Sequence, residues 1–203
     1  GFAEPEEVKE QFSKAGFNDI EFHLIPNNEN LGECAPLYEM MDMVYSLDNN
    51  EYTFFAHAKG VTRETVRKED WYNVEANKTW IKKMLMHNLF STEKIHRILL
   101  EKPCFGIMKS TFEERKLGWY FINSKHRWIY AGGFFWFKHS SLFSQKYKSI
   151  IFQKRYTIES YLSNFFTYDE SGAELSGIGD VVNYSNSPFS ETNWRKWVEK
   201  GYV

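Results

Sequence analysis

The order of apolar and polar segments in the first 60 residues constrains the fold of this chain more than any other feature. Residues 3–15 predict a helix, because Pro5 and three glutamates suit its first turn and Gly16 ends it. Next come a strand, a polar loop, a helix and a second strand, in residues 19–25, 27–32, 36–46 and 51–56. Such an order predicts an α/β fold with a largely parallel sheet and helices on its faces.

The rest of the chain continues the alternation of helices and strands. Helices are predicted at residues 68–89, 92–100, 140–147, 156–165 and 190–200, and strands at 104–108, 128–131 and 134–137. Residues 111–127 are predicted as a long loop with a short helix, and residues 169–179 as a loop. We predict one domain over residues 1–203, in which 168–203 form a C-terminal loop and helix. Because an open sheet of this type begins with a strand, we expect a further strand before the first helix.

Composition excludes several classes of protein. Lys and Arg number 25 against 27 Asp and Glu, so the formal net charge is −2, which argues against a nucleic-acid partner. No apolar run approaches the about 18 residues that a membrane-spanning helix needs, although contact with a membrane surface stays open. Cys34 and Cys104 are expected to be two reduced, buried thiols, or else one disulfide.

The common catalytic and metal-binding motifs are absent from the sequence. It contains no GxGxxG, P-loop, GxSxG, HExxH or CxxC pattern, and no DxD pair of the kind that many sugar-transfer enzymes use to hold a metal. Its six histidines do not have the spacing of a zinc site. Three other segments remain as candidates for chemistry.

The first candidate segment is residues 57–60 (HAKG), which follow a predicted strand. Ligands of open α/β sheets bind at the carboxyl ends of strands, and side chains two apart in an extended segment point the same way. Lys59 suits a diphosphate, and Gly60 allows the backbone to approach a ligand closely. The structural alternative is that His57 ends a strand and Lys59 is solvated.

The second and third candidates lie further along the chain. Residues 130–136 (YAGGFFW) place two glycines between a strand and bulky aromatic rings, which suits a turn under a flat ligand such as a sugar, or simply a packed core. Glu159 lies in the first turn of a predicted helix. Its carboxylate suits a general base, or merely a favourable charge at a helix start.

Together these segments resemble a group of glycosyltransferases from bacterial surface-polysaccharide clusters and from large DNA viruses of algae. Residues 52–63 (YTFFAHAKGVTR) resemble the group's Y-x-x-x-x-H-[ST]-K-G-V stretch. Residues 130–137 (YAGGFFWF) resemble its Y-S-G-N-F-W-W-A stretch, and residues 155–159 (RYTIE) its later R-x-x-x-E. Their order and rough spacing agree over residues 21–162, which is about two thirds of the chain.

The resemblance implies a GT-A fold, a Rossmann-like type with a mixed, mostly parallel central sheet flanked by helices. In that type a strand, an Asn/Gly loop and a helix precede a strand that ends in DxD. Here His57 and Lys59 stand where the two aspartates would be. Because Mn²⁺ and Mg²⁺ prefer oxygen ligands, this pair is a poor metal clamp. We therefore expect either no cofactor or Mn²⁺ or Mg²⁺, with His57 as a weak candidate metal ligand.

The activity implied by the resemblance is transfer of a sugar from a nucleotide diphosphate donor, expected to be a UDP-sugar, to a hydroxyl of a glycan or glycoprotein. Lys59, beside His57, is then expected to balance the charge of the leaving diphosphate, helped by Arg63 or Arg155. If the enzyme inverts the sugar, Glu159 is the expected base. The resemblance also implies a cytoplasmic location, in a bacterium or in a virus-infected host cell.

The resemblance also assigns binding residues. The residues expected near the nucleotide are Asn27, Asn30, Gly32 and Gly60, and those expected near the sugar or acceptor are Gly132, Gly133, Trp136, Asp70 and Trp71. Two other classes stay open: a non-catalytic carbohydrate-binding module on the same fold, and another nucleotide-dependent transferase of α/β type. A transferase should use a UDP-sugar, whereas a lectin-like module should bind glycan without nucleotide.

Overall fold

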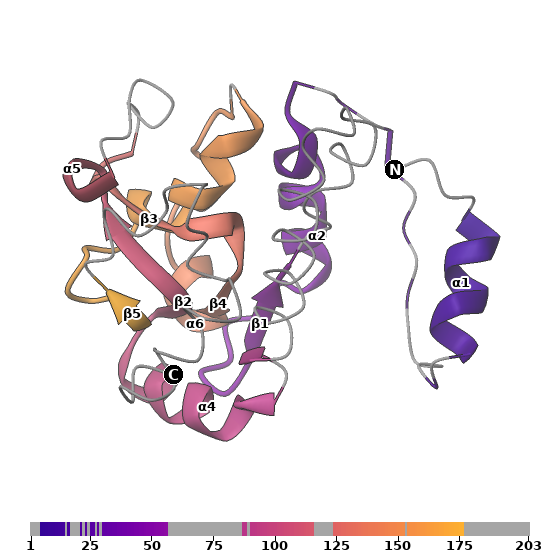
Figure 1. Ribbon diagram of the computed structural model, residues 1–203, viewed down its shortest axis with the longest axis horizontal. Coiled ribbons are helices and arrows are strands. Elements are labelled where there is room, and N and C mark those ends of the chain that lie inside the picture. The colour runs from indigo at the N-terminus through magenta and orange to yellow at the C-terminus, as the bar shows by residue number, and fades with distance from the viewer. Residues whose placement is uncertain are drawn as a thin grey trace, which may run out of the picture.

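A five-stranded mixed sheet with helices on both faces organises the described part of the chain, as a computed structural model shows (Figure 1). The structure describes residues 5–14, 16, 21, 23, 25, 26, 28, 30–56, 87, 88, 90–115, 124–152 and 154–176. The α-helices are α1 (Pro5–Lys14), α2 (Leu37–Met43), α4 (Thr92–Glu101), α5 (Phe112–Arg115) and α6 (His139–Phe143). The strands are β1 (Tyr52–Phe55), β2 (Cys104–Thr111), β3 (Trp128–Tyr130), β4 (Phe135–Lys138) and β5 (Gly172–Ser176).

Four short 3₁₀ helices complete the described elements. They are η1 (Gly32–Cys34), η5 (Ala131–Gly133), η6 (Arg155–Ser160) and η7 (Leu162–Asn164). The predicted helix at 156–165 is therefore two 3₁₀ segments, whereas the helices predicted at 3–15, 36–46 and 92–100 are confirmed with small shifts of their ends. Figure 1 shows α1 beyond α2, apart from the sheet.

The strand order corrects the prediction of a mostly parallel sheet. The strands lie in the order β1-β4-β2-β3, with β5 also paired to β2. Among the described strands, β1 with β4, β4 with β2 and β2 with β3 are antiparallel, and β2 with β5 is parallel. The α/β class and the mixed sheet are thus confirmed. The predicted parallel direction of neighbouring strands was wrong because β4 lies between β1 and β2, and a local sequence pattern does not encode this placement.

Two local predictions also need correction. Residues 169–179 were expected to be a loop, but β5 occupies Gly172–Ser176 and pairs with β2 through its backbone. Glu21, His23 and Ile25, the described residues of the strand predicted at 19–25, belong to no strand. The helix predicted at 190–200 and most of the one at 68–89 lie outside the described residues.

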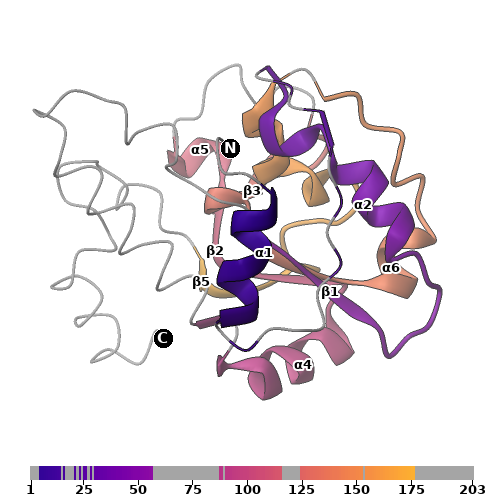
Figure 2. The same cartoon turned by 90° about the vertical axis from the view of Figure 1, so that its right-hand side faces the viewer.

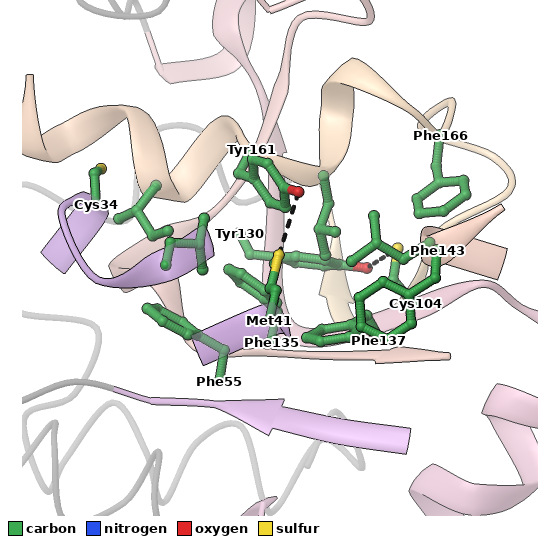
Figure 3. Close-up of a cluster of buried hydrophobic side chains, with 14 of the residues drawn as sticks. Cys34, Met41, Phe55, Cys104, Tyr130, Phe135, Phe137, Phe143, Tyr161 and Phe166 are labelled. Atoms are coloured by element: carbon green, nitrogen blue, oxygen red, sulfur yellow. Dashed lines mark hydrogen bonds between the residues drawn. The ribbon is translucent and has the colours of Figure 1, made fainter. Parts of the chain in front are cut away.

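The larger core covers one face of the sheet and consists mostly of aromatic rings (Figure 3). Phe55, Phe135 and Phe137 project from β1 and β4 and are less than 5% exposed. Two groups of side chains in one layer cover them. One is Leu37 and Met41 from α2, and the other comes from α6 and residues 158–162 and comprises Leu142, Phe143, Ile158, Tyr161 and Leu162. This packing fixes the short helices over the sheet, since burial of large rings is the main stabilising term in such a core.

Tyr130 and Gly106 interlock within this core. The Tyr130 ring lies so close to β2 that a Cβ at Gly106 would stand 2.3 Å from its Cδ1 atom. At the far end of the ring, the hydroxyl donates to the carbonyl of Gly172 at 2.7 Å and lies 3.5 Å from the thiol of Cys104. Gly106 is therefore required for space, and the ring links β2, β3 and β5.

Helix α4 covers the opposite face. Ile95 and Leu99 pack on Phe105, next to Trp136, which is half-buried. The side chains of adjacent strand residues alternate between faces, so Phe105 and Trp136 point to α4 while their neighbours point to the larger core. Figure 2 shows α4 on one side of the strands and α2 on the other, which completes the three layers.

Candidate functional site

Three 3₁₀ segments from different parts of the sequence meet beside the larger core of the sheet. η6 packs against both η1 and η5, and Figures 1 and 2 both show residues 155–164 beside the start of α2. We call Gly32–Cys34, Ala131–Gly133 and Arg155–Ser160 the site edge. It brings the predicted residues Gly32, Gly132, Gly133 and Glu159 into one region.

The loop before η1 is ordered by Asn28. Its side-chain Oδ1 accepts hydrogen bonds from the backbone N–H groups of Asn30 and Leu31, each at 3.1 Å. Its carbonyl accepts from the N–H of Gly32 at 2.7 Å, where φ is 49°. An Asn that turns the backbone in this way is a common loop device. Asn30 was predicted as a site residue and Asn28 was not, although the run of Asn residues in this loop was a signal for it.

The two glycines of η5 adopt left-handed backbone angles. Gly132 has φ 86° and ψ −6°, and Gly133 has φ 70°. Residues with a Cβ avoid this region, apart from Asn and Asp. Both glycines are buried, and they carry the chain from β3 to β4. The predicted tight turn at this position is confirmed.

Glu159 lies in η6 and is partly exposed, between buried neighbours. Ile158 on one side is fully buried in the core, and Ser160 on the other side is 3% exposed. Thr157 closes the first turn of η6, because its backbone N–H and its hydroxyl both donate to the carbonyl of Lys154. The carboxylate is thus carried by a short turn whose two sides are packed.

Cys34 connects η1 to η6. Its sulfur lies 3.7 Å from the carbonyl oxygen of Lys154 and 3.7 Å from Oγ1 of Thr157. Burial raises the pKa of the Cys34 thiol to about 12, against the lowering effect of the Thr157 hydrogen bond. Cys34 and Cys104 are both buried and form no disulfide, which confirms the expectation of two reduced thiols.

The carboxyl end of β1 lies next to the start of β4. Phe55 pairs with Phe135, and their rings stack with centroids 5.0 Å apart. Ala56, the described residue that follows β1, therefore lies close to Phe134. The predicted site residues that lie outside the described residues are Asn27, His57, Lys59, Gly60, Arg63, Asp70 and Trp71, together with the side chain of Arg155.

Trp136 is not brought together with the site edge. Its ring stacks on Phe54, with centroids 5.0 Å apart, and its Nε1 donates to Oδ1 of the buried Asn88 at 2.8 Å. The ring lies on the α4 face, whereas η6 covers the other face. The aromatic run after the two glycines therefore serves both cores of the sheet.

Comparisons with known proteins give no match: no family model, no curated protein and no solved structure is similar to this chain. Among the described residues, no group of three or more His, Cys, Asp or Glu side chains is placed to hold a metal ion. In the same part of the chain, every helix is too short or too polar to cross a membrane.

Proposed function

We propose that this chain is a GT-A-type glycosyltransferase that moves a sugar from a nucleotide diphosphate donor, a UDP-sugar, to a hydroxyl of a glycan or glycoprotein. The observation that carries the proposal is the site edge. η1 and η6, which are far apart in the sequence, meet there, and η5 also packs on η6. To these segments the resemblance assigns an Asn/Gly loop for the nucleotide, two glycines for close approach, and a carboxylate on a short helix. The end of β1 lies beside the start of β4, which follows the two glycines.

In the reaction proposed, the bond from the sugar's anomeric carbon to the diphosphate breaks while a bond to the acceptor oxygen forms. UDP leaves with the electron pair of the broken bond, and Lys59 balances its charge with Arg63 or Arg155. Glu159 takes the proton of the acceptor hydroxyl in an inverting transfer. Any metal that takes part would have to be held by residues other than a His-x-Lys pair alone, because Mn²⁺ and Mg²⁺ prefer oxygen ligands.

The backbone of Gly133 gives the resemblance independent support. The related motif often has Asn at this position, where this chain has Gly133. Its φ of 70° is an angle that Asn and Gly adopt far more readily than other residues. The backbone angle at position 133 therefore allows Gly or Asn and disfavours a β-branched residue.

A thermal-shift screen against nucleotides, nucleotide sugars and free glycans, with and without Mn²⁺, tests the proposal. A ligand that binds the native state raises the melting temperature according to its affinity and concentration. We expect UDP and at least one UDP-sugar to stabilise the protein. Stabilisation by glycans alone would instead identify a carbohydrate-binding module, and stabilisation by a non-sugar nucleotide alone would identify another transferase.

Two variants then assign the roles. Glu159→Gln should lower turnover about 10²–10⁴-fold and leave UDP binding unchanged, because only the proton acceptor is lost. Lys59→Ala should weaken UDP binding measured by calorimetry. The exposed residues Glu39 and Lys146 supply the matched controls Glu39→Gln and Lys146→Ala. Normal turnover in Glu159→Gln would show that Glu159 is not the base. Complete loss of activity in EDTA, with rescue by Mn²⁺, would show that carboxylates elsewhere hold a metal.

A further inference from the structure

The thiol of Cys34 occupies the junction between the nucleotide loop and the turn that carries Glu159. Cys34 is 2% exposed and ends η1, directly after Gly32 and Glu33. On the other side it contacts the start of η6: the Lys154 carbonyl and the Thr157 hydroxyl at 3.7 Å each, and the backbone of Ile158. The residue after Ile158 is Glu159, so one thiol touches the peptide segment that holds the carboxylate.

The far end of η6 is held by different contacts. Tyr161 is fully buried, and its hydroxyl donates to the carbonyl of Tyr147 at 2.7 Å. Ser163, also buried, donates to the carbonyl of Ser160 at 2.7 Å. These contacts do not involve η1, so we expect the junction at Cys34 to affect the first turn of η6 more than its last.

We propose that Cys34 is a positioning residue, whose thiol joins the nucleotide loop to η6 and thereby sets the position of Glu159 for sugar transfer. The inference rests on the proposed function, since it gives Cys34 a role in that reaction. It assigns no chemistry to the thiol itself. Burial raises its pKa to about 12, which leaves it protonated and unreactive at neutral pH.

Kinetics of Cys34→Ala test the proposal directly. A small displacement of a catalytic group costs turnover more than substrate binding, so we expect kcat for transfer to fall about tenfold with KM for the UDP-sugar changed less than threefold. Cys34→Ser should recover most of the loss, because its hydroxyl can donate a hydrogen bond to the same Lys154 carbonyl. The matched control is Cys104→Ala, which removes an equally buried thiol that contacts Tyr130 and Ser171 instead of η6.

A double-mutant cycle with Thr157→Val shows whether the thiol acts through η6. This variant keeps the shape of Thr157 but removes the hydroxyl that faces the thiol. If both residues act through one contact, the double variant should lose no more turnover than the worse single variant. If the loss of turnover in the double variant equals the product of the two single fold-losses, the two residues act independently, and the proposal is overturned.

Alkylation adds a readout that needs no acceptor. In the Cys104→Ala chain, Cys34 is the remaining thiol, and because it is buried, iodoacetamide reaches it only through an opening of the structure, such as a separation of η1 from η6. Saturating UDP should slow this reaction several-fold, because a ligand bound at the closed junction disfavours its opening. If the wild-type chain transfers sugar but Cys34→Ala and Cys104→Ala lose the same turnover, the proposal is overturned and the function stands. If the wild-type chain neither binds UDP nor transfers sugar, the proposed function falls, and the role of Cys34 with it.

Discussion

The sheet core and the site edge are held together in different ways. In the core, Phe135, Phe137 and Tyr161 are at most 1% exposed and are fixed by contacts between large rings. At the site edge the backbone is set by the left-handed glycines of η5 and by the polar contacts of Asn28 and Cys34. A buried ring contributes several kcal/mol, whereas a hydrogen bond contributes about 1 kcal/mol. The core should therefore dominate stability, and the edge should dominate binding and turnover.

The largest expected effect tests the core. Phe137→Ala removes a fully buried ring that contacts Phe143 and His139, and should lower the free energy of unfolding by about 3–5 kcal/mol. Urea denaturation measures the loss as a shift of the midpoint at constant slope. Leu47→Ala, at a side chain 57% exposed, is the control and should cost less than about 0.5 kcal/mol. Equal effects of the two variants would contradict the assignment of the core.

A second prediction concerns a glycine that is needed for space. Gly106→Ala would place its Cβ 2.3 Å from the Tyr130 ring, so the ring or strand must move. We expect a loss of about 1–3 kcal/mol, as is usual for overpacking. Combination with Tyr130→Leu should cost less than the sum of the two single changes, because the smaller side chain removes the clash. If the free-energy losses of the two single changes simply add in the denaturation experiment, the clash between position 106 and the Tyr130 ring is not the cause.

A third prediction concerns a glycine that is needed for its backbone angle. Gly133→Val should cost about 1–2 kcal/mol, since its φ of 70° is unfavourable for a side chain with a branched Cβ. Gly133→Asn should cost clearly less, because Asn tolerates this region. Melting temperatures of the two variants, measured side by side, check the order. A reversed order would show that space decides this position, as it does at Gly106.

The smallest expected effect is a pH dependence at the opposite end of β1. Burial lowers the pKa of His139 below its usual 6.5, although Glu51, 3.2 Å away, acts in the other direction. Below pH 6.5 the unfolded chain binds a proton that the folded chain does not, so stability should fall by less than about 1 kcal/mol between pH 7 and 5. His139→Gln should reduce this slope in denaturation experiments at the two pH values. An unchanged slope in His139→Gln would place the acid sensitivity elsewhere.

Local patterns were enough for several elements but not for their pairing. The helices at α1, α2 and α4 and the strands β1, β2, β3 and β4 were predicted because their apolar residues recur with the expected period. β5 was missed because Gly172 and its neighbours have the composition of a loop. It becomes a strand through backbone pairing with β2, close to Ile98 and Phe105, and such a partner does not show in a local pattern.

The candidate site divides in the same way. The glycines of η5 and the acidic residue of η6 could be named from the sequence, because a turn and a helix start have characteristic residues. The roles of Asn28, Cys34 and Thr157 could not, since each depends on a partner that the fold supplies. For Trp136, its place beside the glycines predicted a ligand contact, which stays a prediction. Strand alternation turns its ring to Phe54 and Asn88.

The sequence by itself therefore determined the α/β class, two buried thiols, and a turn at Gly132 and Gly133. These properties follow from the period, composition and backbone freedom of nearby residues. Only the tertiary structure decided the antiparallel order of β1, β4 and β2, and the meeting of η1, η5 and η6 at the site edge. Both depend on contacts between segments that are separated in the sequence, whose energy exists only once the aromatic core has brought them together.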